Sequence, residues 1–342
     1  MAAGTMLLDM AMGYMRSRIV GAAARLRIAD ALANGARTVG QLASACSADP
    51  ASLHRLLRAL ASLGIFTETA PGTFALTPLG EPLRRDVPNS QWAGVVFWAD
   101  LLADNWVHLT ECVKTGDKAA RIMERSGLPT RWSQDPDADA IFRAVMGTVP
   151  IEQYAAIANS WDFAPWQTVA DLGGGGGSLI IAVLRSFPHL QGMLVDRPAS
   201  IEAAAPRFES EGLTSQCRLL AADLLEAVPA GAQVYMLKHV LHGYDDEQAV
   251  RLLKNCRSAM PRDGRVLVIE FVLPSTVNRV DPELEKCLRS DLNMLAVTGG
   301  KERTAMEWER LLGGAGLKLL RVIPVPGNTA SVIEASQPGR EG

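Results

Sequence analysis

The sequence predicts an α/β chain in which a mostly helical N-terminal part precedes a parallel sheet covered by helices. Apolar residues recur at helical spacing through much of the first 160 residues. From Gln167 onward, short apolar runs alternate with helical segments, which is typical of a parallel sheet. Five consecutive glycines follow the first of these runs. We expect strands at residues 169–172, 193–195, 218–221, 234–237 and 265–269.

The first predicted element is a helix over residues 6–32. Ile19 and Ala23 begin an apolar face that continues to Leu32. Further apolar residues near the terminus, such as Met6 and Met10, add surface that one subunit would not cover alone. A dimer interface is therefore favoured over a plain core helix.

A winged-helix pattern comes next. Thr38 and Gln41 form a capping box for one helix, and Asp49 with Pro50 begins another. Two short strands are then expected at residues 64–68 and 74–76, with a Pro-Gly turn between them.

Binding to DNA is disfavoured. The second helix offers only His54, Arg55 and Arg58, and the predicted wing has no Lys or Arg. The net charge is −3, whereas phosphate contacts need several cations. We therefore expect a dimerisation module and no nucleic-acid partner.

Composition predicts a cytoplasmic protein without a membrane partner. Hydrophobic residues make up 48% and charged residues 21% of the 342 residues. The five cysteines form no CxxC pair, so neither a disulfide framework nor a structural zinc site is expected. The N-terminus lacks a basic signal-peptide region, and no apolar run approaches the roughly 20 residues of a membrane span.

Three regions follow from these patterns. A helical and winged-helix dimerisation domain is expected at residues 1–90, and the sheet-containing domain at residues 161–342. Residues 91–160 form a helical connector in which Pro129 and Pro136 interrupt the pattern.

The glycine run indicates a ligand-binding loop between a strand and a helix. Gly173 and Gly175 allow the backbone to turn sharply and approach a ligand. The dinucleotide motif G-x-G-x-x-G is met only imperfectly, because its sixth position, counted from Gly173, is Ser178. Asp171 would also repel a pyrophosphate. That carboxylate suits a ligand with a cationic amino group, and S-adenosylmethionine carries one.

Two further acids follow the next two strands. Asp196 can accept hydrogen bonds from ribose hydroxyls, although NAD-binding folds share this spacing. Asp223 can take the adenine amino group while Leu224 packs on its ring. Parallel sheets bind ligands at the carboxyl ends of their strands, so three acids there indicate one nucleoside site.

Three stretches resemble a known family. They are residues 171–175 (DLGGG), 237–247 (LKHVLHGYDDE) and 291–304, which begins DLNM and ends GGKERT. The chain resembles bacterial and plant small-molecule O-methyltransferases, of the caffeate and anthracycline types. The resemblance implies a Rossmann-like class I methyltransferase domain after a winged-helix dimerisation domain, in a homodimer that uses S-adenosylmethionine.

The resemblance also implies roles for individual residues. His242 matches the catalytic histidine, and Glu270 and Glu302 match its two flanking glutamates. Lys238 matches a position near the cofactor. Positions that line the acceptor pocket are matched by Phe142, Met146, Asn293 and Met294.

The chain departs from the family at Gly243-Tyr244, where many relatives have Asp-Trp. The missing carboxylate affects contacts to the acceptor, while Tyr244 can still supply an aromatic wall. His239, three residues before His242, competes for the role of base but lacks the family match.

The expected chemistry is proton removal followed by methyl transfer. A phenol has a pKa of about 10 and a histidine of about 6.5, so His242 is suited to take the hydroxyl proton. Glu270, Glu302 or both orient the imidazole. No metal is required, and the acceptor is expected to be a small aromatic secondary metabolite.

Three other functions remain open at this point. A relative with the same cofactor pocket could perform hydroxylation or decarboxylation instead of methyl transfer, which His242, Glu270 and Glu302 argue against. A winged-helix regulator that senses a ligand is disfavoured by the poorly basic second helix. An NAD-dependent oxidoreductase is disfavoured by Asp171 and the imperfect glycine spacing.

Overall fold

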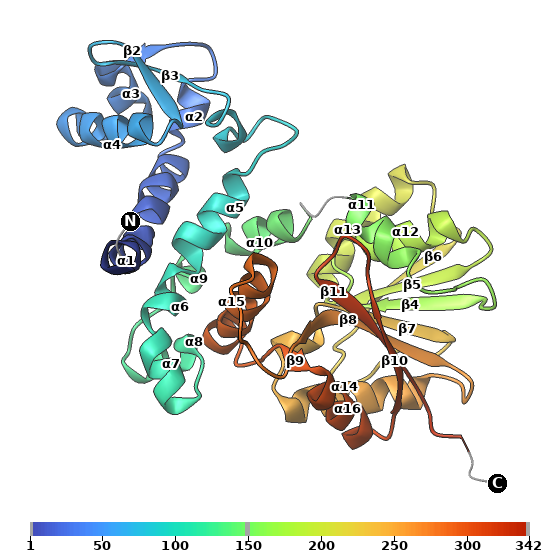
Figure 1. The fold of residues 1–342 in the computed structure, drawn as a ribbon. Helices are drawn as coiled ribbons and strands as arrows, with labels where there is room; N and C mark the ends of the chain where they lie inside the picture. The colour runs from blue at the N-terminus through green and yellow to red at the C-terminus, as the bar shows by residue number, and fades with distance from the viewer. Residues whose placement is uncertain (1–2, 148–150, 340–342) are drawn as a thin grey trace. The chain divides into compact units, whose positions relative to one another are not determined.

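The computed structural model describes residues 3–147 and 151–339. It divides into two compact units (Figure 1). The first contains residues 1–107 and 126–145, and the second contains residues 108–125 and 146–342. The helical segment 91–160 is therefore shared between the two units.

The first unit has the predicted helical and winged-helix character. Its small antiparallel sheet has the order β1-β3-β2 (Figure 1). Leu57, Leu60, Phe66 and Phe74 lie in its core. Its first elements are α1 (Ala3–Arg25), α2 (Ile28–Ala31), β1 (Arg37–Thr38), α3 (Val39–Cys46), α4 (Pro50–Ser62), β2 (Phe66–Ala70) and β3 (Thr73–Leu76).

Both predicted helix caps of this unit are confirmed. Thr38 accepts a hydrogen bond from the Gln41 amide, and the Gln41 side chain accepts one from the Thr38 amide. Asp49 accepts from the Ser52 amide at 2.8 Å. The predicted single helix over residues 6–32 is wrong, because Arg27 adopts a left-handed φ of 54° between α1 and α2.

Short helices form the segment between the wing and the large sheet. Phe142 and Met146 both lie on α10, one turn apart as expected. The elements are η1 (Glu81–Leu83), α5 (Trp92–Val96), the π-helix η2 (Phe97–Leu101), α6 (Ala103–Val107), α7 (Leu109–Thr115), α8 (Ala119–Arg125), α9 (Arg131–Gln134), α10 (Ala138–Met146) and α11 (Ile151–Ala158).

The second unit contains the predicted parallel sheet, extended by three strands that the sequence analysis did not anticipate. The order is β10-β11-β8-β7-β4-β5-β6, with β9 beside β8. Of the three added strands, β9 pairs in parallel, whereas β10 and β11 are antiparallel. The strands are β4 (Thr168–Leu172), β5 (Gln191–Asp196), β6 (Cys217–Ala221), β7 (Val234–Lys238), β8 (Arg265–Leu273), β9 (Arg303–Thr304), β10 (Lys318–Pro324) and β11 (Ala330–Ser336).

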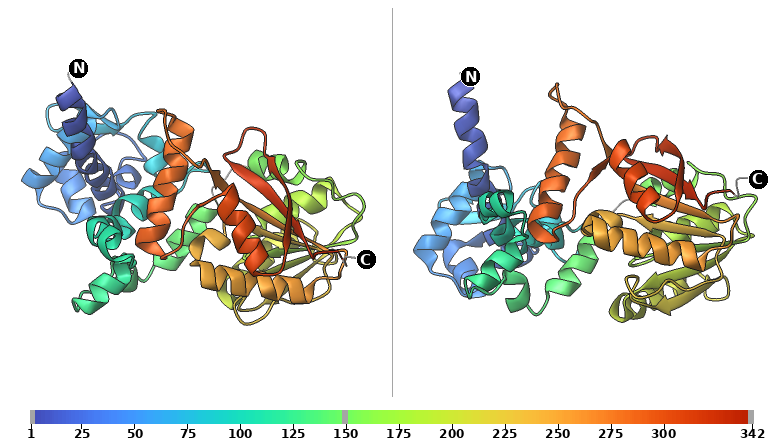
Figure 2. Two further views of the ribbon diagram at one scale, coloured as in Figure 1. Left: turned by 60° about the horizontal axis from the view of Figure 1, so that its bottom comes forward. Right: turned by 90° about the horizontal axis from the view of Figure 1, so that it is seen from below.

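Helices cover both faces of this sheet (Figure 2). On one face Ile180 and Phe208 pack against Val169, and on the other Leu252 and Trp308 pack in the same cluster as Ala170. Adjacent residues of β4 thus point to opposite faces, as the strand pleat requires. The helices that follow β4 in the chain are α12 (Ser178–Ser186), α13 (Pro198–Ser210), α14 (Asp246–Ala259), α15 (Pro282–Val297) and α16 (Ala305–Gly314), with the 3-10 turn η3 (Leu241–Gly243).

Two remaining features concern surfaces. Among the described residues, no helix combines the length and the apolarity that crossing a bilayer requires. The N-terminal part of α1 exposes large apolar side chains, namely Met6, Leu7, Leu8, Met10, Met12, Tyr14 and Met15.

Candidate active site

The glycine loop connects β4 to α12 at the carboxyl edge of the sheet. Gly173 has a φ of 67°, and a Cβ atom there would lie 2.8 Å from a methyl group of Val240. The amide of Gly175 donates a 2.8 Å hydrogen bond to Oδ2 of Asp196. The loop is therefore fixed against the end of β5, with little room for side chains at its first glycine.

Asp171 lies beneath this loop and is almost completely buried. It is 1% exposed, and among the described residues neither carboxylate oxygen has a hydrogen-bond partner of good geometry. Burial raises the pKa of Asp171 to about 7, against the opposing influence of the Ile180 amide and the Lys238 ammonium. A buried carboxylate without a partner costs free energy that a bound cation would recover.

The second and third acids lie at the ends of the neighbouring strands. Asp196 is the last residue of β5, and Asp223 follows β6, which pairs with β5 in parallel. Leu224 is buried beside the glycine loop. Burial raises the pKa of the Tyr244 phenol, the charges of Asp223 and Asp196 act in the same direction, and that of Arg197 opposes them. Tyr244 packs against the apolar cluster that contains Leu224.

The glycine loop, Asp171, Asp196 and Asp223 together form a cradle, and Lys238 connects this cradle with a second group of polar residues. It is the last residue of β7, and its Nζ lies 5.1 Å from the centre of the Tyr154 ring. Burial lowers the pKa of Lys238, while the charges of Glu270 and Asp171 act against that change. Lys238 therefore lies within electrostatic reach of both carboxylates.

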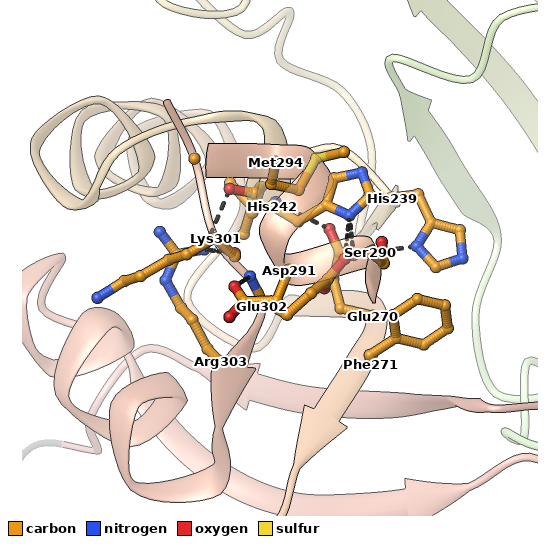
Figure 3. Close-up of polar contacts among 12 residues, drawn as sticks. His239, His242, Glu270, Phe271, Ser290, Asp291, Met294, Lys301, Glu302 and Arg303 are labelled. Carbon is orange, nitrogen blue, oxygen red and sulfur yellow. Dashed lines mark hydrogen bonds and ion pairs between the residues drawn. The ribbon is translucent and has the colours of Figure 1, made fainter. Parts of the chain in front are cut away.

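His242 and Glu302 form the central pair of the second group (Figure 3). Nδ1 of His242 lies 2.8 Å from Oε1 of Glu302, which also accepts a 2.8 Å hydrogen bond from Ser290. Burial disfavours the charged imidazole, but the charge of Glu270 and the hydrogen bond with Glu302 outweigh it. The pKa of His242 is therefore raised above its usual value.

Glu270 holds the backbone of the same loop. It is completely buried on β8, and its Oε1 accepts from the amides of Val240 at 2.9 Å and His242 at 3.3 Å. Its Oε2 lies 3.1 Å from Nδ1 of His239 and 3.6 Å from Nδ1 of His242. Burial opposes ionisation, yet the neighbouring histidines and amide hold the pKa of Glu270 below its usual value.

The role of Arg303 was missed by the sequence analysis. Its fully buried guanidinium donates to the carbonyls of Leu241 and Tyr244, at 3.1 and 3.2 Å, and to Asp246 at 2.8 Å. These carbonyls flank His242, and Arg303 itself follows Glu302. The arginine thus holds the segment that contains His242 against the segment that contains Glu302. Its place in the matched stretch was visible in the sequence, but its burial was not.

Close backbone contact joins the same two segments. A Cβ atom on Gly300 would lie 2.0 Å from the carbonyl oxygen of His242. The amide of Glu302 donates a 2.8 Å hydrogen bond to Asp291 of α15. Figure 3 draws Asp291 and Met294 together with the residues around His242. Ser290 and Asp291 are additional site residues that the sequence analysis did not assign.

The predicted acceptor residues occupy three places. Phe142 packs in the first unit between Phe97 and Trp132, with ring centres 5.9 and 5.7 Å away. Met146 is 46% exposed. Asn293 and Met294 lie on α15 of the second unit, and Asn293 is buried. Their part in acceptor binding stays a prediction.

One group of side chains in the described part of the chain has metal-ligand geometry. Ligand atoms of His239, His242 and Glu270 all lie within 4.8 Å of one another. A metal ion on Nδ1 of His242 would displace the hydrogen bond with Glu302. That the reaction needs no metal stays a prediction, and dialysis against a chelator tests it.

Comparison with known proteins identifies the class. The sequence model of the O-methyltransferase domain matches residues 106–318, and that of the O-methyltransferase dimerisation domain matches residues 8–85. Phenazine O-methyltransferase of Lysobacter antibioticus is 35% identical over 97% of this chain and 95% of its own length. O-demethylpuromycin-O-methyltransferase of Streptomyces alboniger is 34% identical over 96% of this chain and 88% of its own length.

Solved structures agree with these matches. A mitomycin 7-O-methyltransferase shares 33% identity and a TM-score of 0.87 over 98% of both chains. An O-methyltransferase from neocarzinostatin biosynthesis was solved with S-adenosylmethionine and 2-hydroxy-5-methyl naphthoic acid. It has a TM-score of 0.80 and 34% identity, over 94% of this chain and 96% of that one. The fold is that of a class I methyltransferase. The chain belongs to the O-methyltransferase family, as the resemblance predicted.

The relatives also include an enzyme that acts on nitrogen. The 8-amino-8-demethylriboflavin N,N-dimethyltransferase of Streptomyces davaonensis is 34% identical over 92% of this chain and 90% of its own length. Family membership thus indicates methyl transfer, but the family includes enzymes that methylate oxygen and enzymes that methylate nitrogen.

Proposed function

We propose that this chain methylates a hydroxyl group on a small aromatic metabolite, with S-adenosylmethionine as methyl donor and His242 as general base. The observation that carries the proposal is the 2.8 Å contact between Nδ1 of His242 and Glu302. A carboxylate there keeps the proton on Nδ1, so Nε2 is left with the lone pair that accepts the hydroxyl proton.

The cofactor cradle fits S-adenosylmethionine better than a dinucleotide. The carboxylate of Asp171 is 1% exposed and has no hydrogen-bond partner of good geometry among the described residues, so it suits an ammonium group and would repel a pyrophosphate. Asp196 and Asp223 lie at adjacent strand ends, where they would receive ribose hydroxyls and the adenine amino group, with Leu224 and Tyr244 of one apolar cluster as walls. When bound, the cofactor supplies a methyl group on a positively charged sulfur.

The chain's own residues then prepare the acceptor. Nε2 of His242 takes the hydroxyl proton as the oxygen attacks the methyl carbon, so the imidazole becomes cationic. The charges of Glu302 and Glu270 stabilise that cation. Lys238 interacts electrostatically with both Asp171 of the cofactor cradle and Glu270 beside His242. The products are the methyl ether and S-adenosylhomocysteine, and the proton leaves His242 to solvent.

An aromatic acceptor is supported by two observations. Phe142 belongs to a group of aromatic rings with Phe97 and Trp132. The relative from neocarzinostatin biosynthesis was solved with a naphthoic acid. We retain Phe142, Met146, Asn293 and Met294 as proposed acceptor residues.

We further propose that the protein is a homodimer formed through its N-terminal part, and that it binds no nucleic acid. The match to the dimerisation domain and the exposed apolar side chains of α1 support the dimer. Light scattering should give a mass of about twice 36.7 kDa. A monomer at micromolar concentration would contradict the dimer.

Calorimetric titration tests the proposed cofactor. Purified protein should bind S-adenosylmethionine and S-adenosylhomocysteine but not NAD, and Asp196→Ala should weaken both. Glu202→Ala, on the surface of the adjacent helix α13, is a matched control. Binding of NAD alone, or of none of the three, would overturn the proposal.

A panel of acceptors then tests the reaction. Wild type and His242→Ala are supplied with S-adenosylmethionine labelled in its methyl group and with phenols and anilines of equal size. Label should appear on phenols with wild type and fall by at least roughly 10²-fold in the variant. Transfer to anilines alone would move the function to N-methylation.

A further inference from the structure

A second histidine–glutamate pair lies beside the first. Nδ1 of His239 is 3.1 Å from Oε2 of Glu270, and Nδ1 of His242 is 2.8 Å from Oε1 of Glu302. The two imidazole rings are nearly parallel, with centres 5.2 Å apart and an interplanar angle of 29°. The mechanism proposed above uses only one of these rings.

The hydrogen bonds of Glu270 determine which nitrogen of His239 carries the proton. Oε1 of Glu270 already accepts from two backbone amides, and its carboxylate offers only acceptors. Nδ1 of His239 must therefore donate to Oε2, which leaves Nε2 as an acceptor. Burial lowers the pKa of His239, so the neutral ring with this acceptor is the form present at neutral pH.

The backbone at His239 is strained. Its φ is 52°, in the left-handed region that residues with a β-carbon seldom adopt. The amide of His239 still bonds to the carbonyl of Ile269 at 3.1 Å, so the strain begins directly after strand pairing ends. Such strain is concentrated at functional sites, and here it places the ring against Glu270, Phe271 and His242.

The His239 side chain is also the more accessible of the two. It is 28% exposed, against 15% for His242, while both glutamates are buried. A molecule whose hydroxyl reaches His242 therefore lies beside a second ring that has a free acceptor function. With centres 5.2 Å apart, the two rings are close enough for neighbouring groups on one small aromatic molecule to reach both.

We propose that His239 is a specificity-determining residue, whose Nε2 accepts a hydrogen bond from a second hydroxyl adjacent to the one that is methylated. The preferred acceptor class is thus an aromatic ring with two neighbouring hydroxyl groups. This inference rests on the proposed function, since it takes His242 as the contact for the reacting hydroxyl. It also assigns the two glutamates to different histidines: Glu302 orients His242, and Glu270 orients His239.

A matched pair of ligands tests the inference by binding alone. Calorimetry compares 2-naphthol with 2,3-dihydroxynaphthalene on protein saturated with S-adenosylhomocysteine. One additional hydrogen bond should make wild type bind the dihydroxy compound roughly three- to tenfold more tightly. Equal affinity for the two compounds, including no detectable binding of either, would overturn the inference.

Two variants separate contact from structural support. His239→Asn keeps an amide that can donate to Glu270 but lacks the distal acceptor, so it should bind the two naphthols equally. His189→Asn makes the same change at an exposed histidine outside the site and should keep the wild-type preference. If His239→Asn retains the preference, His239 supports Glu270 only.

The same titrations separate a failure of the proposed function from a failure of the proposed role of His239. If wild-type protein does not bind S-adenosylhomocysteine, the proposed function is overturned. Intact cofactor binding without a preference for the dihydroxy compound would overturn only the role of His239. Thermal unfolding of each variant verifies that the protein titrated is folded.

Discussion

Nδ1 of His242 and Oε1 of Glu302 lie 2.8 Å apart, although 60 residues separate them in the chain. Glu302 precedes the short strand β9, which pairs with the end of β8, and His242 lies in the turn after β7. Strands β7 and β8 are themselves parallel neighbours. The carboxyl edge of the sheet therefore brings His242, the proposed base, and Glu302 together.

The two glutamates should respond differently to neutralisation. Glu302→Gln should lower kcat by about 10²- to 10⁴-fold with a small change in Tm, because it removes the charge that orients and stabilises His242. Glu270→Gln should also lower the free energy of unfolding by about 1–3 kcal/mol, because two amides and His239 depend on it. Steady-state kinetics and thermal unfolding measure both; equal loss of stability in the two variants would contradict this division.

Ionised Asp171 should destabilise the cofactor-free protein, although its carboxylate contributes to cofactor binding. Its pKa rises from 3.8 to about 7 on folding, so the folded chain holds the proton more tightly than the unfolded chain. The protonated form thus adds stability below about pH 4, and this contribution is lost as the pH rises through about 7. The shift corresponds to at most about 4 kcal/mol.

Asp171→Asn should therefore unfold at a higher temperature than wild type at pH 8, with a smaller difference at pH 5. It should also lose most affinity for S-adenosylhomocysteine. Thermal unfolding of cofactor-free protein at both pH values, followed by calorimetry, measures the two effects. A variant that is less stable at pH 8 would show that the carboxylate is satisfied in the free protein.

The site residues that could be predicted were those whose position follows from a local pattern in the sequence. The acids Asp171, Asp196 and Asp223 could be placed together because consecutive parallel strands end at one edge. The roles of Glu270 and Glu302 could not be divided, because the division depends on the left-handed backbone at His239 and on the burial of Arg303. Neither feature leaves a periodic signal in the sequence.

The same limit explains the elements that were wrong or absent. The break at Arg27 is carried by one residue in a left-handed conformation, within a segment whose apolar spacing stays helical. Strands β10 and β11 follow the last helix and pair as an antiparallel hairpin, so they fall outside the alternation that predicted the other strands.

Arg303 should be essential to the fold of the active site. Arg303→Met would leave the carbonyls of Leu241 and Tyr244 without their donor and should cost about 3 kcal/mol or more, with a large loss of kcat. Arg251→Met is the matched control, because within the described part of the chain this arginine forms only an exposed ion pair with Glu226, and its loss should cost less than about 1 kcal/mol. Chemical denaturation measures both; comparable losses would argue against the role of Arg303.

Two glycines near His242 should differ sharply in their tolerance of alanine. A Cβ on Gly300 would overlap the carbonyl oxygen of His242 at 2.0 Å, whereas a Cβ on Gly243 meets no atom within 4 Å. Gly300→Ala should lower both Tm and kcat, since the loop must move. Gly243→Ala should keep the wild-type Tm or raise it through a gain of about 0.4–1 kcal/mol. A destabilised Gly243→Ala protein would show that this departure from the family has a structural cause.

The most direct test of His242 as the general base is the pH dependence of methyl transfer in a single turnover. With His242 as base, the rate should rise with pH through a midpoint above about 6.5, because only the neutral imidazole accepts the proton and its pKa is raised. In Glu302→Gln the midpoint should move to lower pH, since the supporting charge is gone. A rate that is independent of pH between about 5.5 and 9, or the same midpoint in both proteins, would contradict the assignment of His242 as the base.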